Sequence, residues 1–264
     1  MMNIEKTLSG ISPLWGICSY DEIKDSLIEC RAKSRLPQNA RSVIVACFPY
    51  LLPKESYENS NLSKYAVVTD YHSVALGRLN KACEALKDMF PEEEFAAFAD
   101  NSPIPEVRAA CLAGLGVRGM NSLLITENYG SYVFIGEIVT SLELEAKKAE
   151  LRPCAQCGRC LEACPAKALG KSGVDTEKCL SAITQKKGSL TEAEKKLMLE
   201  CGCVWGCDIC QDICPMNRNA AFTQIEEFLC SPVPVLTAQT DIDGRAYEWR
   251  GRKVIERNLA VFGK

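Results

Sequence analysis

The sequence predicts an α+β fold made of two unlike parts and a tail. Up to about residue 145, short β-branched runs alternate with segments of helical periodicity, which indicates a mixed α/β domain built on a sheet. From residue 151 to 220, cysteine and glycine replace the long apolar runs, so this part needs a core of another kind. We expect domains at residues 1–145 and 146–222, and a tail at 223–264 that packs on the core.

The composition is that of a globular chain of 264 residues, 47% of them hydrophobic. A formal net charge of −3 and an isoelectric point near 5.5 are not those of a basic nucleic-acid-binding domain, although they allow a local basic patch. The N-terminus lacks a charged start followed by an apolar run, and no segment has about eighteen uncharged apolar residues. These features predict a cytoplasmic protein that does not engage a membrane.

Local signals place the elements of the first domain. Ser19 and Glu22 form a capping-box pattern, which predicts a helix that ends near Pro37. The β-branched run at 42–48 predicts a buried strand. The other expected elements are a helix at 75–90, a helix at 106–115, and strands at 122–126 and 131–140 joined by a turn.

The rest of the chain has fewer such signals. Thr191 and Glu194 form a second capping-box pattern, which predicts a helix at 191–200. The segment 245–264 is basic and carries apolar residues that can dock on the core. Those residues are Trp249, Val254, Ile255, Leu259 and Val261.

Cysteine usage is concentrated in the second domain. Ten of the sixteen cysteines fall between Cys154 and Cys214, and the sequence has no export signal that would favour disulfides. Metal binding is therefore the better interpretation of this group. The others sit mostly in apolar stretches, where they serve as small buried hydrophobes: Cys18, Cys30, Cys47, Cys83, Cys111 and Cys230.

The spacing of these cysteines is that of bacterial two-cluster ferredoxins. In such a run the first three thiolates bind one 4Fe-4S cubane, and the fourth, which precedes a proline, binds the other. A matching half that also ends in Cys-Pro follows downstream. The first cluster is then expected to take Cys154, Cys157, Cys160 and Cys214, and the second Cys164, Cys207 and Cys210 with a fourth ligand.

Spacing leaves that fourth ligand open among Cys179, Cys201 and Cys203. Plain ferredoxin spacing would put a cysteine where Val204 stands, so Cys203 is displaced by one residue. A pair of zinc sites is the alternative for the whole set, because paired CxxC motifs also bind zinc. Three tandem cysteines followed by Cys-Pro, with a matching second half, favour iron–sulfur clusters.

Two adjacent clusters make a path for single electrons, and such a path needs an acceptor. The first domain is far longer than a ferredoxin requires, so we place the acceptor there. It has no GKS/GKT motif, and a nucleotide cofactor in a Rossmann site is not predicted.

Several motifs, taken in order, resemble the epoxyqueuosine reductases, which are cobalamin-dependent iron–sulfur enzymes of tRNA modification related to the reductive dehalogenases. The similarity runs with gaps from about residue 37 to 219. It is carried by PQNARSVIVACFPY at 37–50, YAVVTDYH at 65–72, ADNSPIPEVRAACLAGLGVRGMN at 99–121, GSYVFIGE at 130–137 and the two cysteine motifs, with a weaker echo in RGRKVIERN at 250–258.

The resemblance implies roles for particular residues. Asp100 occupies the position of the family's proposed proton donor, and a cysteine in a segment like KCLSAIT binds the second cluster, which favours Cys179. Electrons passing through the clusters would reduce cobalt, and Asp100 would protonate the departing oxygen. The implied reaction is reductive removal of an epoxide oxygen.

The resemblance also implies where a corrin would lie, over the N-terminal sheet near the DYH segment and the following glycine turn. The residues concerned are Asp70, Tyr71, His72, Gly116 and Gly119. The chain departs from the family at 117–120, where Val-Arg-Gly-Met replaces Trp-Ile-Gly-Lys, and at Thr69, which replaces an arginine. It also has a shortened N-terminal region and ends without the helical repeats that many members use for tRNA. These departures bear on the substrate more than on the cofactors.

On sequence alone, two of these residues have ordinary structural alternatives. Asp100 precedes Asn-Ser-Pro, a natural turn, and its carboxylate could simply accept hydrogen bonds from the backbone. His72, the only histidine, could cap a helix or pack against the core, and we do not assign it to cobalt.

Three hypotheses for the function follow. The first is a corrinoid-dependent reductase that acts on a modified nucleoside or a related substrate, with a ferredoxin or flavodoxin as electron donor and tRNA as a possible partner. The second is a ferredoxin-like electron-transfer protein with no cobalamin site of its own. The third is a zinc-stabilised binding module.

Overall fold

The computed structural model describes residues 2–146, 149–170 and 173–263. Its centre is a four-stranded antiparallel sheet in the order β1-β2-β6-β3. The strands are β1 (Leu14–Ser19), β2 (Ser42–Pro49), β6 (Val133–Thr140) and β3 (Phe95–Ala99). Strand β2 is buried along its whole length, as its unbroken apolar sequence requires of a strand covered on both faces.

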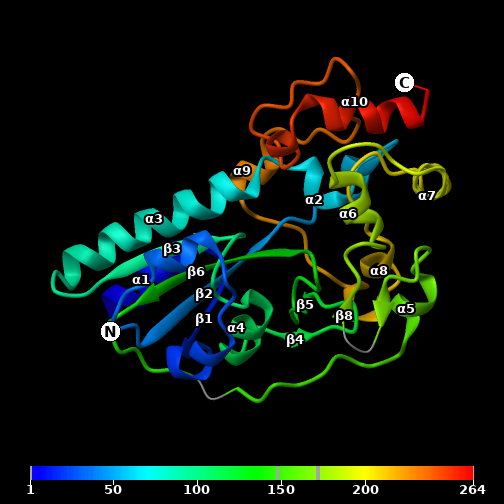
Figure 1. Cartoon of the computed structure of the whole chain (residues 1–264). Coiled ribbons are helices and arrows are strands. Elements are labelled where there is room, and N and C mark those ends of the chain that lie inside the picture. The colour runs from blue at the N-terminus through cyan, green and yellow to red at the C-terminus, as the bar shows by residue number, and fades with distance from the viewer. Residues whose placement is uncertain (1, 147–148, 171–172, 264) are drawn as a thin grey trace.

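Helices cover both faces of the sheet (Figure 1). The long helix α3 (Tyr71–Met89) packs on one face together with α1 (Met2–Ser9). The short helix α4 (Glu106–Leu112) packs on the other face. Alternation along β6 sends Phe134 and Ile138 toward α3 and sends Ile135 and Val139 toward α4. The predicted α+β domain with a sheet is confirmed.

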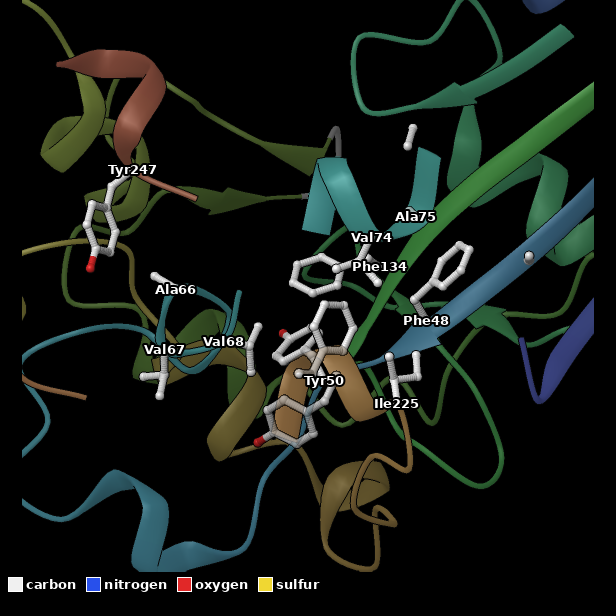
Figure 2. Close-up of a cluster of buried hydrophobic side chains, with 14 of the residues drawn as sticks. Phe48, Tyr50, Ala66, Val67, Val68, Val74, Ala75, Phe134, Ile225 and Tyr247 are labelled. Carbon is white, nitrogen blue, oxygen red and sulfur yellow. The ribbon is translucent and has the colours of Figure 1, made fainter. Parts of the chain in front are cut away.

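Aromatic rings fill the core at the end of the sheet nearest the N-terminus of α3, where Figure 2 shows Tyr50 and Phe134 beside Val68 and Val74. The ring of Phe134 lies 4.5 Å from that of Tyr50 and stacks on that of Tyr71 at 4.0 Å. The same apolar cluster includes Trp205 from the cysteine-rich part and residues of the tail. One continuous core therefore joins the sheet to both later segments.

The cysteine-rich part is built from short elements, as the scarcity of apolar runs predicts. Helix α7 (Glu192–Cys201) is the longest of them, and it starts with the expected capping box of Thr191 and Glu194. The others are α5 (Arg159–Ala163), β7 (Leu169–Gly170), β8 (Gly173–Val174), α6 (Leu180–Gln185) and α8 (Ile209–Asp212). Two further short strands, β4 (Val117–Arg118) and β5 (Leu124–Ile125), lie beside it.

The tail folds back onto the core through α9 (Glu226–Leu229) and α10 (Arg252–Val261). Val254, Ile255 and Leu259 are buried, as expected. Trp249, which was also expected to dock, is 59% exposed. The segment before α3 is tied to the tail because the Asp70 N–H donates to the carbonyl of Gly244 at 2.9 Å. Among the described residues, no helix has the length and apolarity needed to cross a membrane.

The remaining elements are short. They are α2 (Lys64–Val67) and the 3₁₀ turns η1 (Tyr20–Glu22), η2 (Lys24–Ser26), η3 (Arg31–Arg35), η4 (Lys54–Tyr57), η5 (Pro215–Asn217) and η6 (Glu248–Arg250).

The helix predicted between Ser19 and Pro37 is wrong, since this segment forms only the three turns η1 to η3. Ser19 does accept a hydrogen bond, but from the N–H of Asp21, as a single turn requires. The chain then leaves helical geometry because the N–H of Ile28 donates to the carbonyl of Pro103, beyond β3. A tertiary bond has taken the place of the helical one.

The strands near the edge of the domain also differ from expectation. Only Leu124 and Ile125 of the predicted strand at 122–126 are extended, and they pair with β4 in a separate two-stranded sheet. The turn that follows is present, because Thr126 and Gly130 form an antiparallel bridge. Strands β1 and β3 were not predicted.

The close contact between β1 and α4 can be tested at Gly16. A Cβ at this position would lie 2.4 Å from the carbonyl oxygen of Ala113, so Gly16→Ala is expected to lower the free energy of unfolding by about 1–3 kcal/mol. Gly77→Ala is the control, because Gly77 has open space on α3 and alanine is favoured there by about 1 kcal/mol. Urea unfolding measures both; equal effects of the two changes would contradict this packing.

Candidate functional site

Four cysteines from two distant loops line one cavity. They are Cys154, Cys157, Cys160 and Cys214. Pro215 lines the same cavity and turns the chain immediately after the last of them. The structure therefore brings together the four residues that were expected to hold the first cluster, including the one contributed by the downstream half.

The first cysteine loop is anchored to the short sheet of β4 and β5. The Cys154 N–H donates to the carbonyl of Arg118 at 3.2 Å, and Arg118 also forms a bridge with Pro153. Gly116 and Gly119 keep this turn tight. A Cβ on Gly116 would lie 2.4 Å from the carbonyl oxygen of Ile125, and one on Gly119 would clash with the side chain of Asn121. The structure thus gives both glycines a packing role beside the cysteine loop.

The second group of cysteines gathers around Cys210. Burial raises the pKa of Cys210 to about 12, and the neighbouring thiols of Cys179 and Cys164 add to the shift. Cys203 lies near Cys207 in the same way, and Cys201 packs against the apolar cluster of α6 and α7. Cys179 acts electrostatically on Cys210, Cys203 acts on Cys207, and Cys164 acts on Cys201, so the structure leaves all three candidates near the second group.

A hydrogen bond also reaches one thiol of this second group. The N–H of Ala168 points at the sulfur of Cys164 at 3.3 Å. Amide donors of this kind stabilise the negative charge of a bound thiolate and raise the reduction potential of a cluster.

A buried carboxylate fixes the second cysteine loop to the N-terminal domain. Asp208 accepts hydrogen bonds from the Ser63 hydroxyl at 2.6 Å and from the Lys64 N–H at 2.7 Å. The Lys64 ammonium lies 2.7 Å from Asp212. Because Asp208 stands between Cys207 and Cys210, these bonds set the position of both thiols relative to the sheet.

The arrangement of the thiols suits clusters better than single ions. The first four thiols surround one cavity. A cubane carries its ligands at four separate corners, and this donor set fits it.

A second constellation forms where α3 begins and β3 ends. The imidazole of His72 lies between two carboxylates, with Nδ1 at 2.7 Å from Asp70 Oδ1 and Nε2 at 3.1 Å from Asp100 Oδ2. Asp70 also caps α3 by accepting a hydrogen bond from the His72 N–H. The structure thus brings together three residues that the family resemblance had singled out.

Asp100 reaches His72 through an unusual backbone. It follows β3 directly and has a φ of 52°, and the next residue, Asn101, has a φ of 30°. Left-handed geometry at two consecutive residues without a glycine is costly, and such strain is concentrated at functional sites. The Asp100 side chain remains 60% exposed, so its carboxylate faces solvent as well as His72.

Electrostatics favour a proton on His72. Burial opposes the charged imidazolium, but hydrogen bonds to Asp100 and Asp70 outweigh it and raise the pKa of His72 to about 9. His72 in turn lowers the pKa of Asp100 below its ordinary value. At neutral pH the pair is therefore an imidazolium bound to a carboxylate, with one transferable proton.

The ring of Tyr71 packs between the imidazole of His72 and the aromatic core. Its ring stacks on His72 at 4.0 Å and on Phe134 at 4.0 Å, so it connects the imidazole to the aromatic core. Burial raises the pKa of Tyr71 far above its ordinary value, and the phenol stays neutral.

A cavity of about 560 Å³ opens beside Asp100. Its lining includes Ser102, Glu106, Arg108 and Arg118. His72, the only histidine of the chain, has both ring nitrogens occupied by carboxylates and offers none to a metal.

Sequence reasoning missed two carboxyl groups at this site, Glu106 and Glu137. Glu137 is fully buried in the middle of β6, and neither of its oxygens has a hydrogen-bond partner among the described residues. A single acidic residue within the apolar strand SYVFIGEIVT was the signal that could have identified it.

Two family models match the chain. Residues 153–217 match the model described as 4Fe-4S double cluster binding domain, which supports clusters over zinc in this region. Residues 31–101 match the model described as epoxyqueuosine reductase QueG, DUF1730. The second match contains the Asp70–His72–Asp100 constellation.

Curated relatives decide the family. An epoxyqueuosine reductase of Synechocystis is 37% identical over 196 residues, which cover 72% of this chain and 68% of the relative. The chain belongs to the epoxyqueuosine reductase family. A second member, from Lactococcus garvieae, is 32% identical over 78% of the chain, and the match spans 62% of that relative's length.

Solved structures share the fold of this family member. An epoxyqueuosine reductase crystallised with an epoxyqueuosine-modified tRNA stem loop superposes with a TM-score of 0.80 at 23% identity, over 98% of this chain and 80% of that one. A catabolic reductive dehalogenase gives a TM-score of 0.50 at 16% identity over 34% of its own chain, a likeness of fold alone.

The charge state of His72 can be measured directly because the chain has one histidine. Nuclear magnetic resonance titration of its imidazole is expected to give a pKa of about 9 in the native protein. Asp100→Asn should move the pKa down toward 6.5, because one of the two carboxylates that hold the proton is lost.

The same shift affects stability. A folded-state pKa above the unfolded value means that His72 stabilises the fold fully below about pH 6.5 and loses this contribution as pH rises through about 9. A native His72 that titrates near 6.5 would contradict the two-carboxylate geometry.

Proposed function

We propose that this family member reductively removes the oxygen of an epoxide from a modified nucleoside in tRNA. The constellation of Asp70, His72 and Asp100 carries the proposal, since it places a held proton at the mouth of a cavity. Family membership and the double-cluster domain support it. The tRNA stem loop bound by a relative of the same fold suggests the class of substrate.

The reaction requires two electrons and two protons. Both carbon–oxygen bonds of the epoxide break, a carbon–carbon double bond forms, and the oxygen leaves as water. Asp100 is the proton donor to the departing oxygen, because its exposed carboxylate stands between the cavity and the imidazolium of His72. His72 passes its proton through Asp100, and Asp70 keeps the imidazole oriented from the other side.

The electrons would enter through the two clusters. We assign Cys154, Cys157, Cys160 and Cys214 to the first cluster, and Cys164, Cys179, Cys207 and Cys210 to the second. The external donor is proposed to be a small low-potential redox protein such as a ferredoxin or a flavodoxin. The shared core around Trp205 holds the second cysteine loop against the domain that carries Asp100.

The cavity beside Asp100 would hold a corrinoid, which would supply the redox chemistry of cobalt. Arg108, Arg118 and Ser122 line this cavity and can meet the polar side groups of a corrin. Asp70, Tyr71 and His72 would border it from the N-terminus of α3. Gly116 and Gly119 would act indirectly, by holding the turn that carries Arg118.

The proton-donor role predicts a specific loss of activity. With a chemically reduced, cluster-reconstituted and cobalamin-supplemented protein, Asp100→Asn is expected to slow conversion of an epoxyqueuosine stem loop by about 10²–10⁴-fold. Mass spectrometry of the nucleoside measures the loss of oxygen. Asp88→Asn, an exposed aspartate at the opposite end of α3 from His72, is the matched control and should leave the rate unchanged.

The outcomes separate the hypotheses. An active wild type with an equally active Asp100→Asn variant would contradict the role of Asp100. A wild type with intact clusters but no turnover would instead favour an electron-transfer protein without a corrinoid site.

The ligand assignment predicts a difference between two neighbouring cysteines. Cys179→Ala should lose the second cluster and retain about four irons per chain, because three thiolates no longer hold that cubane. Cys203→Ala is the matched control, since Cys203 also lies near the second group and should be dispensable. Iron analysis and cluster absorbance measure both; the reverse pattern would make Cys203 the ligand.

A further inference from the structure

Two acidic side chains lie behind the Asp100–His72 pair and have no role in the reaction as proposed. Glu137 lies on β6, between Val45 of β2 and Phe98 of β3, on the face of the sheet that α4 covers. It is fully buried, and its two oxygens lack hydrogen-bond partners within the described structure. The Ser102 hydroxyl lies nearby and favours the charged form, but burial outweighs this effect.

Glu106 connects this interior acid to the cavity. It is the first residue of α4 and lines the cavity beside Asp100. Although the residue as a whole is only partly buried, its Oε1 is buried and has no partner in the described chain. The Asp100 backbone N–H faces the same carboxyl group. Glu106 therefore contacts the strained turn that carries the proposed proton donor.

The surroundings keep both glutamates protonated. Burial, aided by the charge of Asp100, raises the pKa of Glu106 to about 8. Burial also raises the pKa of Glu137 well above its ordinary range, and Glu106 adds to the shift. Two buried carboxyl groups that act on each other electrostatically cannot readily ionise together, because each anion would repel the other in a medium of low dielectric constant.

Among the other titratable groups around Glu106 and Glu137, only His72 brings a positive charge that acts on one of them. Cys18 on β1, Cys47 on β2 and Tyr71 on α3 have raised pKa values and stay neutral. Asp100 is negative, and His72 is the one cation that acts on Glu106. Arg108 and Arg118 line the same cavity but do not bond to either glutamate in the described structure.

We propose that Glu106 and Glu137 form a buried carboxylic-acid pair that supplies the second proton of the reaction. The proposal rests on the function proposed above, in which one epoxide oxygen must receive two protons before it leaves as water. The Asp100–His72 pair holds only one of them at neutral pH.

Each proton has a defined path. The first passes from His72 through Asp100 to the epoxide oxygen as one carbon–oxygen bond breaks. The second passes from Glu106 to the emptied Asp100–His72 pair, and then to the resulting hydroxyl as the second bond breaks and water departs. Glu137 stays protonated, so no second buried anion opposes the charge that remains on Glu106. The two electrons come from the external redox protein, and solvent in the cavity restores both protons.

Infrared spectroscopy tests the acid pair without turnover. In the cluster-loaded protein labelled with ¹³C-glutamate, a carbonyl band of protonated glutamic acid is expected at neutral pH, and part of it should be lost as pH rises through about 8. Glu106→Gln and Glu137→Gln should each remove part of the band, and the double variant should remove it. Glu92→Gln, an exposed glutamate, is the control. A missing band, or one that survives in the double variant, would overturn the proposal.

Activity then tests the role of the pair. Glu106→Gln is expected to reduce turnover of the epoxide at least about tenfold above pH 7 and less at acid pH, where solvent protons are plentiful. An unchanged pH profile in an active variant would overturn the proton-supply role while leaving the proposed function in place. If the wild type shows the infrared band but no turnover, the proposed function fails, and this role fails with it.

Discussion

Two carboxylates hold the imidazole of His72, and the rest of the candidate site depends on this bond pair. Asp70 begins α3, Asp100 ends β3, and His72 joins them through Nδ1 and Nε2. The connection fixes a strained turn at Asp100 against the end of the sheet. The two carboxylates also keep the imidazole of His72 protonated. Burial alone would lower the pKa of His72, but the interactions with Asp70 and Asp100 together outweigh this effect.

Electron delivery from the cysteine-rich part to this site requires that the two parts do not move independently. Asp208 ties the second cysteine loop to Ser63 and Lys64, and Trp205 enters the apolar cluster shared with the sheet. The first loop is attached to β4 through Cys154. Both cysteine loops are thus fixed to the domain that carries Asp100, as electron delivery over a short and constant distance would require.

Much of this arrangement was predictable because it depends on local spacing. The spacing of the tandem cysteines predicted that they share one cavity. The capping box of Thr191 and Glu194 is a local interaction, and it predicted the start of α7. Strand β2 followed from its apolar run. In each case the signal and the structure lie within a few residues of each other.

What failed depended on tertiary contacts. The helix expected after Ser19 is absent because Ile28 bonds to Pro103, which no local pattern reveals. The bond between His72 and Asp100 joins residues 28 positions apart, and only the family resemblance had placed them in one site. Glu137 was visible as an acid in an apolar strand, but its relation to Glu106 depends on how α4 covers the sheet.

In the proposed function, His72 holds a proton that faces the corrinoid and does not bind cobalt. Electron paramagnetic resonance of cob(II)alamin, titrated into the cluster-loaded protein, tests it most directly. We predict a protein-bound, base-off spectrum without nitrogen coupling on the axial position, because both ring nitrogens of His72 are occupied. Axial nitrogen coupling that disappears in His72→Gln, or a spectrum unchanged from free cobalamin, would contradict the account.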